Sequence, residues 1–139
     1  MTTDGFHQSK AARGQSLTEF AVGITLLLIL LAGVLDLSRA YFTLLSLRDA
    51  AQEGALYGSL APTDTAAIRA RVRTSSGWPV DFSTFTDAQI AIDVSGPVCA
   101  GSELVVTLQM DFILAAPFIG GRVLPLAAEA RDTVLQPPC

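Results

Sequence analysis

Residues 20–35 read FAVGITLLLILLAGVL and contain a single polar side chain, that of Thr25. Helical residues from Leu17 to Leu37 would extend about 30 Å, which matches the hydrocarbon core of a bilayer. A helix that is apolar on every side needs either lipid or a thick layer of protein around it, and a chain of 139 residues offers little protein for that purpose. The sequence therefore predicts a transmembrane helix near the N-terminus, with a buried core helix as the alternative.

The charges that flank this segment predict its orientation. Lys10 and Arg13 stand directly before the apolar run, whereas Asp36 and Arg39 follow it and offset each other. Because positive residues are retained in the cytoplasm, we expect a single-pass protein of the cytoplasmic membrane with its N-terminus inside and its C-terminal part outside. Asp36 and Arg39 are also spaced to form a membrane-exit pair, either as a local anchor or as a contact to a partner.

The residues at the start of the run do not fit an ordinary secretory signal, in which cleavage follows the apolar segment. Here a small residue, Gly14, precedes the run, and Glu19 is the fifth residue counted from Gln15. This arrangement resembles the processing site of type IV prepilins, where prepilin peptidase cuts after the glycine and leaves the hydrophobic helix on the mature protein. The resemblance implies a leader over residues 1–14.

Glu19 stands in an unfavourable place, because an ionised carboxylate at the edge of hydrocarbon is costly unless it is paired or lies among headgroups. The amine that cleavage would create at Gln15 is its natural partner. The resemblance to pilin-like proteins implies that this pairing aligns an incoming subunit with its neighbour. Alternatively, Glu19 lies near lipid headgroup amines and has no role in assembly.

The segment beyond the run narrows the resemblance. It reads GVLDLSRAYF over residues 33–42 and LRDAAQEGALYG over residues 47–58. Together with the glycine and the glutamate, it is similar to the TadE family, minor pseudopilins of tight-adherence (Flp-type) pilus systems. Members have a G-x-x-[DE]-x-x-R-x-x-[YF]-like exit, whose aromatic position Phe42 fills here, and an Ala/Gly-rich A-A-x-x-G-A stretch. The similarity covers residues 13–58, and beyond them only the general pattern agrees.

Membership of this family would imply a structural function. The protein would take part in assembly of a Tad/Flp-type pilus, as a minor pseudopilin in the membrane or in the pilus itself. Its partners would be prepilin peptidase, other pilin-like subunits, the pilus assembly platform and the lipid bilayer. Two alternatives remain: a major filament subunit, although such subunits are shorter and lack a sheet domain, and a membrane-tethered extracytoplasmic binding module unrelated to pili.

The helix is expected to continue beyond the membrane as far as about residue 60, where Pro62 ends it. A stripe of apolar residues recurs at spacings of three and four, and its side chains become smaller along the chain, which lets another backbone approach closely. The stripe would pack either against other helices, within a filament or on a partner pseudopilin, or against the chain's own C-terminal domain. It consists of Leu37, Ala40, Leu44, Leu47, Ala51, Gly54 and Gly58.

The remaining residues, 61–139, predict a small extracytoplasmic α+β domain after the helical segment 15–60. Thr63 or Asp64 can cap a short helix that runs through Thr74, with Gly77 as its stop. A structured loop follows over residues 75–88. We expect its Trp78 in the domain core, with an exposed contact residue as the alternative. Alternating apolar residues then predict three strands of an antiparallel sheet with one face covered by helix, over residues 90–95, 104–112 and 124–131.

Two cysteines, Cys99 in the first predicted turn and Cys139 at the C-terminus, have no C-x-x-C partner and no neighbouring histidine. In an oxidising compartment they could form a disulfide worth roughly 2–4 kcal/mol. Two free thiols are the alternative.

The sequence contains no pattern that predicts catalysis, cofactor binding or nucleic-acid binding. The single histidine, His7, falls in the predicted leader, and no Gly-rich phosphate loop follows a strand. The net charge of −4 gives no electrostatic footprint for nucleic acid, and the basic cluster of Arg69, Arg71 and Arg73 is typical of a solvated helix face. We therefore expect a protein that is not an enzyme and holds no metal or cofactor.

Overall fold

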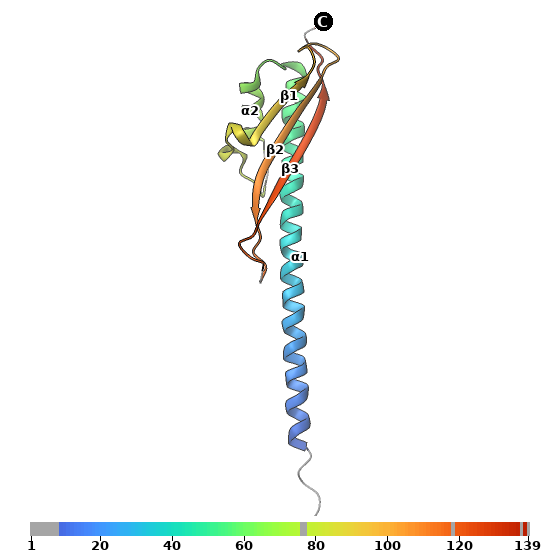
Figure 1. The fold of residues 1–139 in the computed structure, drawn as a ribbon, viewed down its shortest axis with the longest axis vertical. Coiled ribbons are helices and arrows are strands. Elements are labelled where there is room, and N and C mark those ends of the chain that lie inside the picture. Colours follow the sequence, from blue (N-terminus) through green and yellow to red (C-terminus); the bar gives the residue numbers. More distant parts are fainter. Residues whose placement is uncertain (1–8, 76–77, 118, 137, 139) are drawn as a thin grey trace, which may run out of the picture.

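One long helix forms the N-terminal apolar segment and continues into the folded domain. The computed structural model describes residues 9–75, 78–117, 119–136 and 138, with side chains from Gly14 onward. Helix α1 (Ser9–Leu60) has 52 residues. Figure 1 shows its first half standing clear of the other elements and its second half running alongside the sheet. The same segment thus supplies both the apolar rod and part of the folded domain.

A short second helix, α2 (Thr65–Thr74), turns back beside the end of α1. Asp64 caps it as expected, because its Oδ1 accepts a hydrogen bond of 2.9 Å from the backbone N–H of Ala67. Ile68 and Val72, one turn apart, are fully buried. Gly77, the predicted stop, lies outside the described residues.

The loop after α2 contains two single-turn 3₁₀ helices, η1 (Phe82–Thr84) and η2 (Asp87–Gln89). The expectation that Trp78 belongs to the core is wrong, since its side chain is 90 % exposed. Ser46 of α1 holds the backbone here, donating its hydroxyl to the carbonyl of Trp78 at 3.1 Å. Phe82 and Phe85 occupy the core instead, with ring centroids 5.1 Å apart.

Three antiparallel strands follow in the order β1 (Ile90–Ser95), β2 (Glu103–Ile113) and β3 (Val123–Thr133). The predicted strands are confirmed, and β2 and β3 extend slightly further at each end than the sequence indicated. Ile90 pairs with Leu108 across the first ladder, and Leu108 with Ala128 across the second. The alternating apolar residues therefore share one face of the sheet.

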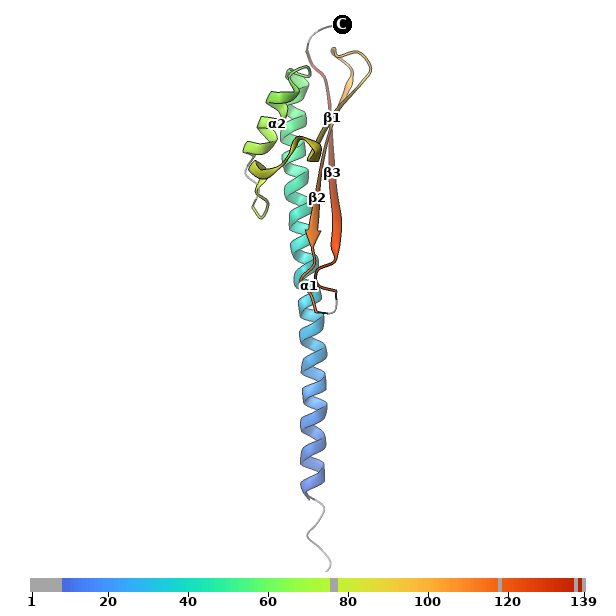
Figure 2. The ribbon, with the colours of Figure 1, turned by 60° about the vertical axis from the view of Figure 1, so that its left-hand side comes forward.

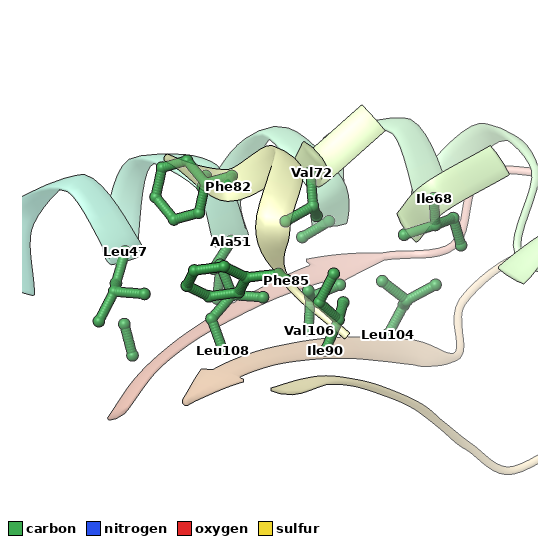
Figure 3. Packing of buried hydrophobic residues seen from close by; sticks show 14 of the residues in the cluster. Leu47, Ala51, Ile68, Val72, Phe82, Phe85, Ile90, Leu104, Val106 and Leu108 are labelled. Atoms are coloured by element: carbon green, nitrogen blue, oxygen red, sulfur yellow. The ribbon is translucent and has the colours of Figure 1, made fainter. Parts of the chain in front are cut away.

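Helices α1 and α2 cover that face, and the other face is open, as the turned view in Figure 2 shows. The predicted α+β architecture, with a long apolar helix, a short helix and a three-stranded antiparallel sheet, is confirmed. Figure 3 shows side chains from α1, α2, the 3₁₀ turns and the sheet meeting in one layer. The largest of the core side chains are Leu47, Ile68, Val72, Phe82, Phe85, Ile90, Leu104, Val106, Leu108 and Val134.

Candidate functional site

The first half of α1 presents apolar side chains to its surroundings on all sides. Within the described residues, α1 is the helix long and apolar enough to cross a membrane, and only 6 % of its most apolar 18-residue stretch is buried by protein. Leu17, Leu27 and Leu30 are each more than 60 % exposed. A core helix would be covered by its own protein, so this exposure supports a membrane anchor rather than the alternative of a buried helix.

The predicted processing residues lie at the free end of this anchor. Gln15 and Glu19 are one helical turn apart, and the Gln15 amide donates to Glu19 Oε1 at 3.2 Å. Gly14 is exposed, and a Cβ atom added there would meet nothing within 4 Å. The residue pair thus lies on one accessible face of the helix, open to an enzyme or to another subunit.

At the other end of the apolar run, Asp36 is the centre of a cluster that the sequence only half revealed. Its carboxylate is buried (5 % exposed), and Oδ2 accepts hydrogen bonds from the backbone N–H groups of Ala115 at 2.7 Å and Ala116 at 2.5 Å. Oδ1 accepts from Arg39 Nη1 at 3.3 Å, and the Arg39 guanidinium lies 5.4 Å from the centroid of the Phe112 ring. We name these five residues the exit clamp.

The exit clamp joins α1 to the loop between β2 and β3. The predicted pair of Asp36 and Arg39 is present, and its aspartate acts as a local anchor within the chain. Ala115 and Ala116 contribute only backbone N–H groups, so no side-chain pattern could have singled them out. Because both orphan donors are satisfied by one charged oxygen in a buried place, the contact fixes the loop firmly to the helix.

The small-residue stripe of α1 packs against the chain's own domain. A Cβ atom added at Gly54 would lie 2.7 Å from Val72 Cγ2, and one added at Gly58 would lie 2.8 Å from Leu104 Cδ1. Three further members of the stripe, Leu44, Leu47 and Ala51, belong to the same core or pack against it. Leu37, also predicted as part of the stripe, is 72 % exposed, whereas Asp36 in the same turn is buried, so Leu37 lies on a side of the helix that the domain does not cover.

A cavity of about 640 Å³ lies beside the exit clamp, between α1, the loop after α2 and the end of β2. Asp81 is one of two carboxylates on its wall, and its pKa is lowered because the hydroxyl and backbone N–H of Ser83 donate to it. This carboxylate therefore stays ionised as a helix cap, which does not suit it to proton transfer. The other lining residues are Arg39, Phe42, Thr43, Trp78, Pro79, Val80, Thr84, Phe85, Met110, Asp111, Phe112 and Ile113.

The structure describes only one of the two cysteines. Cys99 is buried in the turn between β1 and β2, at 8 % exposure, whereas Cys139 lies outside the described residues. The disulfide between them therefore stays a prediction. Across the part of the chain that the structure describes, no three His, Cys, Asp or Glu side chains are grouped so as to hold a metal ion.

Comparison with known proteins gives a match for the segment that contains the anchor, the processing residues, and Asp36 and Arg39 of the exit clamp. Residues 14–56 match the family described as TadE-like protein. No curated protein and no solved structure gave a match. The matched residues are those that carried the resemblance in the sequence, from the glycine before the run to the Ala/Gly-rich stretch after it. Over this N-terminal segment, the chain is similar to the TadE-like family.

Proposed function

We propose that the protein is a minor pseudopilin that takes part in assembly of a Tad/Flp-type pilus, with a structural rather than a catalytic function. In this proposal prepilin peptidase cuts after Gly14, α1 stays in the cytoplasmic membrane, and the sheet domain lies on the extracytoplasmic side. Other pilin-like subunits and the assembly platform are its protein partners. Extraction from the membrane into a pilus is a further step that the same anchor would permit.

The observation that carries the proposal is the combination of the family match with an uncovered apolar helix. The match spans residues 14–56, and the apolar part of that segment is nearly bare of protein. In a membrane, lipid covers such a helix, and in a filament the helices of neighbouring subunits would replace the lipid. The accessible turn of Gln15 and Glu19 lies where both processing and the first contact to a neighbour would occur.

The first test is the mature N-terminus. Intact-mass measurement of the protein from its native host should show loss of residues 1–14, leaving Gln15 first. Gly14→Leu should abolish this loss, because a bulky side chain would stand next to the scissile bond.

Gly23→Leu is the matched control, since Gly23 is also an exposed glycine of α1 with nothing within 4 Å of an added Cβ. It should be processed like the wild type. A mature species that retains Lys10 and Arg13 in the wild type would contradict the prepilin proposal and leave an ordinary signal anchor.

The second test concerns Glu19 as an assembly residue. Glu19→Leu should insert into the membrane at the wild-type level, because a leucine is easier to accommodate near hydrocarbon than a carboxylate. Crosslinking to pilin-like subunits and piliation should instead fall severalfold, since the partner of the new amine is lost. Membrane level, processing and crosslinking are measured in the same cells.

Thr18→Val is the control for Glu19→Leu, because Thr18 lies in the same turn and its hydroxyl bonds only to backbone carbonyls of its own helix. It should crosslink normally. Normal crosslinking and piliation in Glu19→Leu itself would show that Glu19 is an interfacial carboxylate without a role in assembly.

A further inference from the structure

We propose that the loop between β2 and β3 is a second membrane-contacting element, which dips into the headgroup layer of the bilayer beside α1. The loop comprises residues 114–122 and is called the hairpin tip below. The proposal rests on α1 spanning the bilayer, which is part of the proposed function. It does not depend on processing or on pili.

The level of the hairpin tip is fixed by the exit clamp. The apolar segment from Leu17 to Leu37 is centred near Leu27, and half of a bilayer's hydrocarbon thickness corresponds to roughly ten residues of helix. Asp36 therefore lies at the hydrocarbon boundary. Because Asp36 accepts hydrogen bonds from Ala115 and Ala116, the hairpin tip lies at that boundary too. Figure 1 shows the tip reaching further along α1 toward its N-terminal half than any other part of the domain.

The composition of the tip and of the strand ends suits this level. Between Asp111 and Glu129 the chain carries one charged residue, Arg122, and no acidic one. Large apolar side chains here face outward: Ile113 is 61 % exposed, Val123 56 % and Ile119 41 %. Apolar side chains and one arginine are what the boundary between acyl chains and lipid phosphates accommodates. At any other edge of a soluble domain the same patch would be costly to expose.

Most backbone N–H groups of the hairpin tip have hydrogen-bond acceptors within the protein, as a place poor in water requires. Backbone N–H groups exposed to lipid must find partners within the protein, and irregular loops rarely satisfy this demand. Here the Leu114 N–H donates to the Arg122 carbonyl at 3.0 Å, and the Gly121 N–H donates to the Leu114 carbonyl at 2.8 Å, with a φ of +81° at Gly121 that favours glycine. The donors satisfied within the protein are those of Leu114, Ala115, Ala116, Ile119, Gly121 and Arg122.

The occupant of this surface is the lipid leaflet that surrounds α1, because the patch continues the exposed apolar surface of the anchor at the same level. Arg122 favours the phosphate groups of that leaflet. A neighbouring copy or a partner subunit over the same patch is the competing outcome, and the experiment distinguishes it.

The test measures depth in the bilayer with the full chain in liposomes of phosphatidylethanolamine and phosphatidylglycerol. Trp78→Phe first removes the native tryptophan, which is exposed and outside the core. Single tryptophans are then placed by Ile119→Trp at the tip, by Leu28→Trp within the anchor, and by Val98→Trp in the turn at the far end of the sheet. Ile119 and Val98 are matched, since both are 41 % exposed apolar residues in turns. Circular dichroism checks that each variant is folded.

Fluorescence quenching by brominated lipids should give three different results. Ile119→Trp should be quenched severalfold more than Val98→Trp, and more by lipids brominated near the headgroup than by lipids brominated near the chain ends. Leu28→Trp should show the opposite depth preference. Quenching of Ile119→Trp no greater than that of Val98→Trp, with Leu28→Trp quenched, would overturn the proposal while the anchor stands. Loss of quenching in Leu28→Trp would contradict the membrane anchor itself. If Ile119→Trp is protected from the brominated lipids at high protein-to-lipid ratio and quenched at low ratio, the patch is covered by a second copy of the chain.

Discussion

Gly58→Leu should lower the melting temperature of the purified full chain by roughly 10–20 °C, which corresponds to about 2–3 kcal/mol for a folding unit of this size. A Cβ atom at this position would lie 2.8 and 3.0 Å from the two Cδ atoms of Leu104 and 3.1 Å from Ile68 Cδ1, and the rest of the new side chain would have to enter the core. Replacing glycine in a helix returns at most about 1 kcal/mol, which is less than the cost of overpacking. Calorimetry in detergent measures the change.

Gly23→Leu is again the control, because it lies in the same helix and adds its side chain to open space. Its melting temperature should equal that of the wild type. A milder pair, Gly54→Ala with Val72→Ala, should show coupling of at least about 0.5 kcal/mol, because the second change removes the atom that the first one meets. An unchanged melting temperature in Gly58→Leu with reduced crosslinking to other subunits would contradict packing against the chain's own domain and favour packing in a filament.

Asp36→Ala should release the hairpin tip from α1 at a cost of about 2–4 kcal/mol, because two backbone N–H groups lose their acceptor. Amide hydrogen exchange of Ala115 and Ala116 should accelerate strongly, and calorimetry should show a lower melting temperature.

Asp36→Asn separates hydrogen bonding from charge. Both backbone donors bind the same oxygen, Oδ2, so the amide oxygen of asparagine can accept both bonds and lose only the bond to Arg39. We expect it to stay within about 1 kcal/mol of the wild type, as we expect for Arg39→Gln, because the Arg39 side chain is 60 % exposed and solvent screens its charge. Asparagine as destabilising as alanine would show that the ion pair, not the two backbone donors, holds the loop.

The sequence predicted the elements well because each depends on local periodicity. Alternating residues indicated the three strands, and Pro62 and Asp64 marked the end of one helix and the start of the next. The two uses of the stripe could not be separated, since Gly54 and Gly58 permit close approach of any backbone and do not say which one. The structure identifies Val72 and Leu104 as the neighbours.

The wrong prediction for Trp78 and the exit-clamp contacts that the sequence did not indicate have a common cause. A lone tryptophan in a small domain is usually part of the core, but here Phe82 and Phe85 fill that space, and a single 3₁₀ turn brings them together. The contact from Asp36 to Ala115 joins residues 79 positions apart and ends on a backbone group. Neither fact has a local signature, so both depend on how the sheet is laid against the helix.

The continuity of α1 makes the molecule a stiff lever. Between Asp36 and Glu53 the helix contains no proline or glycine, the residues at which helices usually bend, and from Asp36 to Leu60 it extends about 36 Å. A tilt of the anchor by about 10° would therefore sweep the far end of the sheet sideways by roughly 6 Å. Because the helix is rigid, a force that lifts or rotates the anchor within the membrane would also move the turn at Cys99. The position of the domain therefore depends directly on the tilt and depth of its anchor.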